Sequence, residues 1–491
     1  MIKAWEQKTK GDCMMDSMIK KTGITFKELE QNMFRCICEQ GRSAMRKFLE
    51  EYDKYLGEHR DKKAYRNKGP RKTTIKTIFG EVTYRRTVYE VVRDNGKKEF
   101  VYLLDETLEL DHVGLISTGL AEQLVRGITE KSYRECARTI TELTGQSISA
   151  MGVWNVVQDL GRKVCEEENE LAQAYHRGEV VGKKKASVLF EEADGVYLNL
   201  QGKDRIHYKK GKAEMKVAMA YDGWKKTNEG RYALDGKVAT AGFAKAEVFK
   251  EHHEAAIAEK YDLDQTKLRI LNADGGSWTK TASSGADYFQ LDVFHRNKAI
   301  KEHIREKEAV NAIYEHLQQK DLDGLFNYLE TYKNSLSDDD EIEDVEALIE
   351  YFDHNRDGLI PYLEREIELP ENDNGLEYRA MGTMENHIWS IIAKRMKHNH
   401  TSWSIRGGNH LAKLLAKKCS GRLDEVTEKC KKRLFEEQAA SEMIADIIKP
   451  GPNYIPTFTG KGYEYPEKGH FPALDYKMQG NRRQLFGVVD V

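Results

Sequence analysis

Features that would direct the chain to a membrane or out of the cell are missing from its 491 residues. No apolar stretch approaches the ~18 residues that a membrane-spanning helix needs. The opening segment, MIKAWEQKTKGDCMMDS, lacks the apolar core and small-residue cleavage site of a secretory signal. Charged residues make up 32% and apolar residues 40%, which is typical of globular proteins. We therefore expect a cytoplasmic protein of several domains with no membrane partner.

Cysteine patterns with a structural role are also absent. The seven cysteines are an odd number, none of them forms a CxxC motif, and no histidine cluster completes a zinc site. Zinc sites and disulfide frameworks depend on such spacings. The sequence therefore predicts reduced thiols and argues against a zinc finger.

The formal charge is small overall but uneven along the chain. The whole chain has a net charge of −3. Residues 301–380 contain 23 acidic and 8 basic residues, a net charge of −15, so the rest of the chain carries +12. A basic surface attracts polyanions because each phosphate contact releases bound counterions. The pattern is compatible with a nucleic-acid partner, although ordinary solvated surface explains it as well.

The spacing of apolar residues changes within the first hundred residues. Up to about residue 65 they recur every three or four positions, which predicts helix. From Thr73 the period changes to two, which predicts strands. Gly80 and Asn95-Gly96 are typical turn positions, so we expect a small β-meander.

Three helical segments follow between residues 113 and 175. The second ends on Gly145, as a helix with a C-cap does, and Ser147 or Ser149 is expected to cap the third. Two short helices, a turn that contains glycine and a third helix are typical of a helix-turn-helix. A plain helical linker has the same pattern, so both interpretations stay open.

The sequence becomes α/β from about residue 185. Three strand-like segments come first, and the order then runs helix, strand, helix, strand, helix. Three leading strands are expected to form an antiparallel meander, and later strands to join by crossovers. This order is the layout of an α/β RNase H-like core, a mixed five-stranded sheet flanked by helices. One strand ends on Asp274, and we expect a helix to follow it through Trp278.

An acidic helical segment interrupts this core, and a basic helical stretch resumes it. The last ~45 residues are rich in proline, glycine and tyrosine and are expected to form an extended tail. The predicted regions are 1–66 (N-terminal helices), 67–110 (β-meander), 111–178 (helix-turn-helix-like region), 185–300 (first part of the core), 301–380 (acidic insertion), 381–445 (last part of the core) and 446–491 (tail).

Three carboxylates are candidates for one site. Asp194 lies in the first strand of the core, where an unpaired acid is unfavourable, and Asp274 ends the strand after the first helix. Those two strands are neighbours in the expected layout, and Glu385 begins a late helix. Each acid alone has an ordinary explanation: a strand end, a helix N-cap, or a first-turn acid favoured by the helix dipole. Glu191 and Glu192 adjoin Asp194, and one or both are expected to face away.

Clustered carboxylates repel one another unless cations neutralise them. Their hard oxygen atoms select Mg²⁺ or Mn²⁺. Two such ions ~3.5–4 Å apart activate an attacking oxygen and stabilise the leaving oxygen of a phosphodiester. We therefore predict that Asp194, Asp274 and Glu385 bind two Mg²⁺ (or Mn²⁺) ions.

Four blocks of sequence point to a known family: EEADGVYLNLQ, ILNADGGSW, LDVFHRNKAI and GTMENHIWSIIAKRMKHNHTSWSIRGGNHLAKLL. Together they resemble the ISLre-type bacterial insertion-sequence transposases, RNase H-like DDE enzymes related to the Mutator-like superfamily. The resemblance covers most of the chain. It implies that Asp194, Asp274 and Glu385 are catalytic. The segment DVFH is similar to the (C/D)xxH motif of that superfamily, which implicates Asp292 and His295.

The resemblance also implies what the protein acts on. Its partners would be double-stranded DNA, both the terminal inverted repeats of the element and target DNA, and further copies of the chain in a homodimer or larger assembly. It would work in the bacterial cytoplasm, on the nucleoid. Candidate DNA contacts are Ser149, Trp154, Lys394, Arg395, Trp403, Arg406 and His410, with simple packing and solvation as the alternative for the last three.

Two other functions fit the same residues. A catalytically silent, transposase-derived DNA-binding protein would bind DNA without cutting it. A structure-selective nuclease on the same fold would cut branched DNA whatever its end sequence.

Overall fold

The computed structural model describes residues 25–93, 96–108, 116–144, 147–227, 230–283, 285–372, 375–398 and 400–428. Two compact units divide the chain, 1–434 and 435–491, and the second lies outside the described residues. The predicted tail and the predicted turn and cap at Asn95 and Gly145 also fall outside them. Within the described ranges, no helix combines the length and apolar character that crossing a membrane requires.

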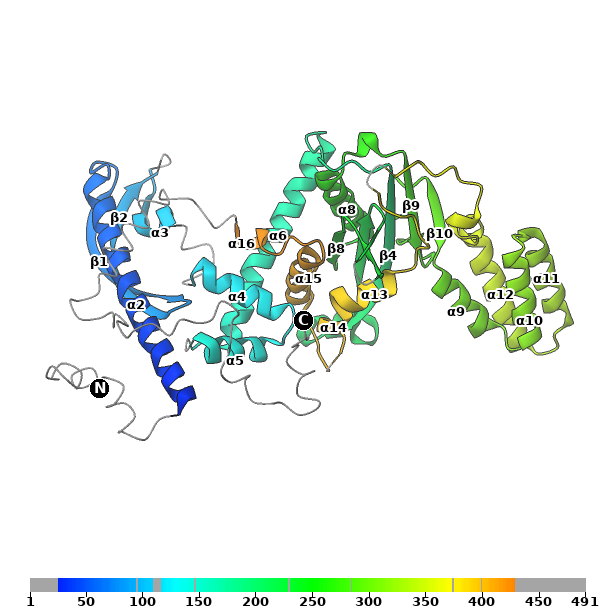
Figure 1. The fold of residues 1–491 in the computed structure, drawn as a ribbon, viewed down its shortest axis with the longest axis horizontal. Helices are drawn as coiled ribbons and strands as arrows, with labels where there is room; N and C mark the ends of the chain where they lie inside the picture. Colours follow the sequence, from blue (N-terminus) through cyan, green and yellow to red (C-terminus); the bar gives the residue numbers. More distant parts are fainter. Residues whose placement is uncertain are drawn as a thin grey trace, which may run out of the picture. The chain divides into compact units, whose positions relative to one another are not determined.

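The N-terminal part pairs a long helix with a three-stranded sheet (Figure 1). Thr25 caps the helix in a capping box with Glu28. Gly80 has a φ of 116° and lies where β1 turns back into β2, as predicted. The elements are α2 (Phe26–His59), β1 (Arg66–Thr77), β2 (Gly80–Val92), β3 (Lys98–Val101) and α3 (Leu103–Leu108).

Three helices follow, as the sequence predicts: α4 (Thr118–Ile128), α5 (Tyr133–Thr144) and α6 (Ala150–His176). Ser149, rather than Ser147, caps α6 by accepting a hydrogen bond from the N–H of Gly152 at 3.0 Å. Apolar side chains at helical spacing pack α4, α5 and α6 into one core with α15.

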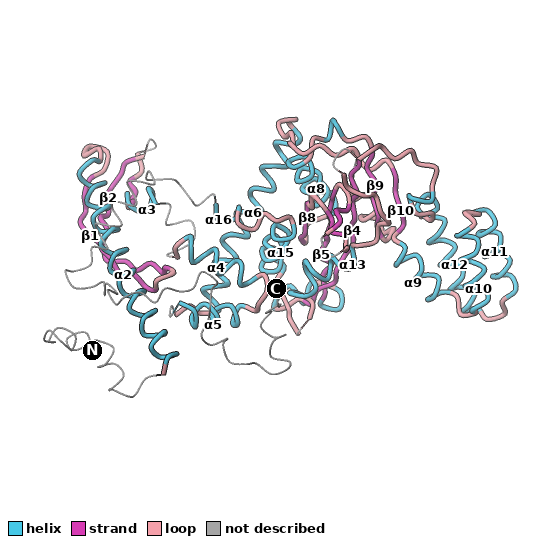
Figure 2. Tube along the Cα trace, viewed as in Figure 1, coloured by secondary structure: helices cyan, strands magenta, loops and turns pink. Residues whose placement is uncertain are grey.

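The central sheet has five strands in the order β10-β9-β4-β5-β8 (Figure 2). β4, β5 and β8 form an antiparallel meander, and β9 and β10 run parallel to β4. The predicted meander and crossovers are confirmed. The strands are β4 (Val188–Asn199), β5 (Lys212–Tyr221), β8 (Val238–Gly242), β9 (Leu268–Ala273) and β10 (Tyr288–Leu291). Short additional elements are α7 (Gly202–His207), β6 (Trp224–Lys226) and β7 (Tyr232–Leu234).

Helices cover both faces of this sheet. Side chains alternate along a strand, so Leu189 and Ala193 of β4 face one side and Val196 and Leu198 the other. The first side packs against α8 (Ala246–Lys260). The second packs against the helices near the end of the described chain. These are α13 (Met384–Ile388), a π-helical turn (Trp389–Ala393), α14 (Lys394–Met396), α15 (Ile405–Cys419) and α16 (Glu425–Glu428).

The acidic insertion forms a helical layer with its own apolar core. Helix α9 leads into it from β10, and α12 contacts α9. The helices are α9 (Val293–His303), α10 (Lys307–Gln318), α11 (Leu322–Ser335) and α12 (Asp339–His354).

Candidate functional site at the ends of the parallel strands

Three aspartates follow one another across the parallel half of the sheet. The paired register of β4, β9 and β10 ends at Ala193, Ala273 and Leu291. The next residue in each strand is an aspartate: Asp194, Asp274 and Asp292. Because the three strands run in the same direction, these aspartates share one edge and one face of the sheet. Asp194 and Asp274 therefore converge as the sequence predicts, and Asp292 joins them.

His295 lies against this row. It is in the first turn of α9, and Asp292 caps that helix by accepting from the N–H groups of Phe294 and His295 at 3.0 and 3.2 Å. The Nδ1 atom of His295 is 3.4 Å from Oδ1 of Asp292. The Asp292 carboxylate raises the pKa of His295, and the charges of Asp194 and Asp274 raise it further. The ring thus favours the protonated, positively charged form beside the three acids.

The surroundings of Asp194 raise its pKa. Burial raises its pKa to about 6, and the charges of Asp274 and Asp292 contribute in the same direction. The positive charge of His295 and the N–H of Gly195, 2.6 Å from Oδ1, oppose that rise. The carboxylate form is therefore disfavoured in the folded protein, and a bound cation would stabilise it.

Asp292 behaves differently although it is also buried. Burial raises its pKa, but hydrogen bonds from His295 and Asn272 outweigh that effect, so the pKa lies below its ordinary value. Asn272 donates to Oδ2 of Asp292 at 2.8 Å. Two neighbouring aspartates thus have pKa values shifted in opposite directions, a difference that often marks a functional site.

Asp274 opens a turn, not a helix. Its Oδ1 accepts hydrogen bonds from the N–H of Gly276, at 2.9 Å, and from the hydroxyl of Thr279. Residues 277–281 form successive turns, so the predicted helix through Trp278 is wrong. Gly275 has a φ of 81°, and a Cβ atom there would come within 2.5 Å of the Asn355 side chain. The glycine lets the chain turn tightly against the insertion and fixes the carboxylate.

Glu192, whose direction the sequence leaves open, lies directly beside the row of aspartates. It is fully buried on the same face as Asp194. Its carboxylate accepts from the hydroxyl of Tyr221 at 2.6 Å and from the hydroxyl and N–H of Thr383 at 2.7 and 2.9 Å. Burial raises its pKa. Glu192 and Asp194 are two residues apart in one strand, so their side chains point to the same face. This spacing was the signal in the sequence for the direction of Glu192.

Glu385 lies on the helix that Thr383 attaches to β4. Helix α13 contacts β4 (Figure 1). The Glu385 side chain itself is exposed and makes no hydrogen bond or ion pair within the part of the chain that the structure describes. The structure thus brings Asp194, Asp274, Asp292 and His295 together, and it places Glu385, exposed, on the adjacent helix α13.

The donor set suits a hard divalent cation. Carboxylate oxygens are the preferred ligands of Mg²⁺ and Mn²⁺, and burial, together with the charges of Asp274 and Asp292, raises the pKa of Asp194. Among residues 25–428, apart from the gaps noted above, no three His, Cys, Asp or Glu side chains are already arranged to hold a metal ion. The chemistry of the row fits a metal.

Other acids of the core serve the fold. Glu191 faces the opposite side of β4. There Arg269 contacts Glu191 at 2.6 Å, and Arg269 also contacts Glu254 of α8 at 2.9 Å. Asp222 and Asp235 lie in turns between the early strands, and both pair with Lys184. These ion pairs explain the three acids without a ligand.

The candidate DNA contacts near the end of the core divide into buried and exposed residues. Trp403 is buried and donates its Nε1 hydrogen to the carbonyl of Met396 at 2.8 Å. His410 is buried against Gln158, with its Nδ1 2.9 Å from Oε1. In this structure, Trp403 and His410 are packed in the protein interior, which is the alternative to a DNA contact. Arg406 is exposed.

The remaining candidates lie on helix ends. Ser149 is occupied in capping α6, and Trp154, one turn later, is 38% exposed. Lys394 is exposed and pairs with Glu130 at 3.3 Å. Arg395 donates to the carbonyl of Ile128 at the end of α4, at 2.9 Å.

Fold and site together define a mixed α/β protein with an acidic centre at the ends of its parallel strands. The chain belongs to the uncharacterised protein family UPF0236, whose model matches residues 19–433. A UPF0236 protein of Caldanaerobacter subterraneus subsp. tengcongensis is 25% identical over 417 residues, which cover 83% of this chain and 80% of the relative. The UPF0236 protein in the vanSb 3′ region of Streptococcus gallolyticus is 22% identical over 411 residues, 82% of this chain and 85% of the relative.

Proposed function

We propose that this protein is a DNA transposase with an RNase H-like core. It would cut DNA at the ends of an insertion sequence and join those ends to a target. The observation that carries the proposal is the row of Asp194, Asp274 and Asp292 at the ends of three adjacent parallel strands. The sheet order, a meander of three strands with two parallel strands beside it, supports the assignment of the core.

The names of the relatives add an independent argument. One UPF0236 protein of Caldanaerobacter subterraneus subsp. tengcongensis carries eleven designations in its name, and another carries four. We interpret these as several copies of one gene in a single genome. An element that moves and multiplies leaves such copies behind, which supports a role in transposition for this chain.

The catalytic residues have distinct roles in this proposal. Asp194, Asp274 and Glu385 would hold two Mg²⁺ or Mn²⁺ ions, which supply an activated water and stabilise the leaving oxygen when bound. Asp194, with a pKa of about 6, is mostly ionised at neutral pH. His295 offsets the repulsion between the aspartates through its positive charge. Catalytic contacts often tighten only in the complex with substrate, and we propose that Glu385 turns towards the row when DNA binds.

The helices α4, α5 and α6 are the proposed readers of the terminal inverted repeats. Met151, Trp154 and Asn155 form an exposed strip at the start of α6, while Val153 and Val156 are buried. An exposed strip at the N-terminal end of the third helix is what a helix-turn-helix presents to the major groove. Two DNA ends must be held together for joining, so a homodimer or larger assembly is part of the proposal.

A nicking assay tests the catalytic claim. The full chain is incubated with Mg²⁺ and an oligonucleotide that contains one end of the element, and strand cleavage is followed on a gel. We expect a nick that frees a 3′-hydroxyl at the element end, and loss of the nick in Asp274→Ala. Equal cleavage by wild type and Asp274→Ala would overturn the metal site.

One observation favours a second function. Glu385 is exposed and makes no hydrogen bond or ion pair among the described residues, which a catalytically silent DNA-binding descendant would tolerate. The same assay separates the two proposals, because a silent protein binds the element end without cutting it. Cleavage of branched DNA irrespective of end sequence would instead favour a structure-selective nuclease.

A further inference from the structure

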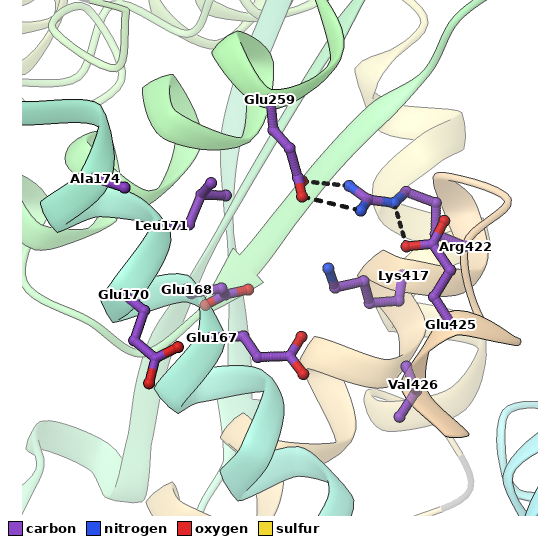
Figure 3. A pocket seen from close by; sticks show the side chains of 10 residues that line it. All are labelled: Glu167, Glu168, Glu170, Leu171, Ala174, Glu259, Lys417, Arg422, Glu425 and Val426. Atoms are coloured by element: carbon purple, nitrogen blue, oxygen red, sulfur yellow. Dashed lines mark hydrogen bonds and ion pairs between the residues drawn. The ribbon is translucent and has the colours of Figure 1, made fainter. Parts of the chain in front are cut away.

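Two cavities lie on either side of α15, and their charges are opposite. The first, of about 300 Å³, is lined by five glutamates and by Lys417 and Arg422 (Figure 3). Arg422 is already bound there, by Glu259 at 2.5 and 3.1 Å and by Glu425 at 2.7 Å. This cavity is net negative and repels anions.

The second cavity, of about 230 Å³, is net positive. Its charged lining residues are Lys237, Lys394, Arg395 and Lys418, against one carboxylate, Glu130. They come from four separate parts of the chain: the turn before β8, helix α14, the end of α15 and the residues after α4. Four positive charges against one negative charge leave an excess of three in one concave space.

The cations of this cavity are only partly neutralised. Glu130 is shared between Lys394, at 3.3 Å, and Lys418. No carboxylate of the described residues pairs with Lys237, and one buried guanidinium nitrogen of Arg395, Nη2, has no hydrogen-bond partner among them. The unpaired charge of Lys237, in a hollow with an excess of positive charge, is the feature that an anionic ligand satisfies.

Size and position indicate which anion this is. A cavity of about 230 Å³ accommodates a phosphate group with several waters, since one water takes roughly 30 Å³. His387 and Lys394, which line it, belong to the helical stretch that also carries Glu385. An occupied cavity would therefore hold a DNA strand close to the proposed catalytic helix.

We propose that Lys237, Lys394, Arg395 and Lys418 form a binding site for one phosphate group of the DNA backbone. The identity of the ligand as DNA rests on the proposed function, whereas phosphate as its chemistry rests on the cavity alone. The site joins the end of α4, in the proposed DNA-reading region, to α14 and α15 of the core. Backbone phosphate contacts of this kind set the position of a duplex without reading its sequence.

The test compares lysines on the two sides of α15. Variants Lys237→Ala and Lys418→Ala remove a charge from the basic cavity, and Lys417→Ala removes the same charge from the acidic one. Binding of a fluorescent duplex to the full chain is measured by anisotropy across a salt series. Each basic-cavity variant is expected to reduce the slope of log affinity against log salt by about 1, as loss of one phosphate contact does. Lys417→Ala is expected to keep the wild-type slope.

A second arm uses free pyrophosphate and thermal melting of the same variants. Stabilisation of wild type and Lys417→Ala, but not of Lys237→Ala, supports the site even if no variant alters DNA binding, and then assigns it to a free phosphate compound. Wild type that fails to bind DNA but responds to pyrophosphate contradicts the proposed function and leaves the site standing. Unchanged salt slopes together with no differential response to pyrophosphate overturn the site.

Discussion

Strand β4 presents two buried glutamates to opposite faces of the sheet, and the two faces surround them differently. On one face, Glu191 lies against the guanidinium of Arg269, which also binds Glu254. On the other face, Glu192 accepts hydrogen bonds from the neutral donors of Tyr221, Thr383 and Asn272. Two residues further on, that second face carries Asp194 and the row of aspartates.

The difference separates an acid that contacts an arginine from acids that lie among other carboxylates. The guanidinium of Arg269 supplies a positive charge beside Glu191, and Glu254 shares it. The opposite face gathers Asp194, Asp274 and Asp292 beside the positive charge of His295. Repulsion between these carboxylates lowers the stability of the protein unless a cation binds. Clusters of like charge with shifted pKa values are common at functional sites.

The largest expected effect is a loss of stability on the face of β4 that carries Glu191. Arg269→Ala removes the positive charge that the buried carboxylates of Glu191 and Glu254 share, so the free energy of unfolding is expected to fall by about 3–5 kcal/mol. Urea denaturation followed by circular dichroism measures it. The matched variant Arg269→Met with Glu191→Leu should recover part of the loss, since a buried pair is often replaceable by apolar residues. A loss below 1 kcal/mol in Arg269→Ala would remove the contrast between the faces.

On the site face, Asp194→Asn is expected to reduce cleavage of an element end by a factor on the order of 100 to 1000 or more, because a charge that stabilises the transition state is lost. Duplex binding should be retained. Gel-based cleavage rates and anisotropy measure the two quantities. The control is Asp264→Asn, an exposed aspartate that precedes β9, at the opposite end of that strand from Asp274, and a similar loss in that variant would contradict the assignment.

The same substitution should stabilise the protein at neutral pH. The folded-state pKa of Asp194 is about 6, above its ordinary value of 3.8. The folded state therefore binds this proton more tightly than the unfolded state, and the associated stability is full below pH 4 and lost as the pH rises through 6. At roughly 1.4 kcal/mol per pKa unit, Asp194→Asn should exceed wild type by up to about 3 kcal/mol at pH 7.5 without divalent ions.

Melting curves of wild type and Asp194→Asn between pH 4 and pH 8 check this prediction. Their difference in stability should shrink towards zero at pH 4, and Mg²⁺ should narrow it at pH 7.5. A difference that is independent of pH would mean that the aspartate is not held in an unfavourable environment.

The smallest effect concerns the attachment of α13. Glu192→Gln replaces an acceptor by an NH₂ group facing the donors of Thr383 and Tyr221, and the free energy of unfolding is expected to fall by about 1–3 kcal/mol. Cleavage should fall more than the stability loss explains, since α13 carries Glu385. Tyr221→Phe, which removes one donor only, is the comparison, and equal cleavage defects in both variants would argue against a role of Thr383.

Much of the architecture follows from local patterns. Helical spacing predicts α4, α5 and α6, and Ser149 caps the last of them as expected. The order of strands and helices predicts the meander and the two parallel strands that the sheet contains. Asp274 is recognisable because an apolar run stops at it, and Asp194 because it lies inside a strand.

Other features were beyond a local pattern. The turn after Asp274 replaces a predicted helix because Asp274 itself binds Gly276 and Thr279 and because Gly275 meets Asn355, 80 residues away. The basic cavity draws Lys237 and Lys418 from distant segments, and neither was a candidate.

The sequence alone thus determined which segments become helices and strands, since periods of 3.6 and 2 are properties of neighbouring residues. Tertiary structure decided which side chains contact each other. Whether a carboxylate on β4 meets an arginine, a threonine or another carboxylate depends on the register of β9 and on which helix covers that face. Register and covering helices are set by the packing of the whole core, which no window of sequence contains.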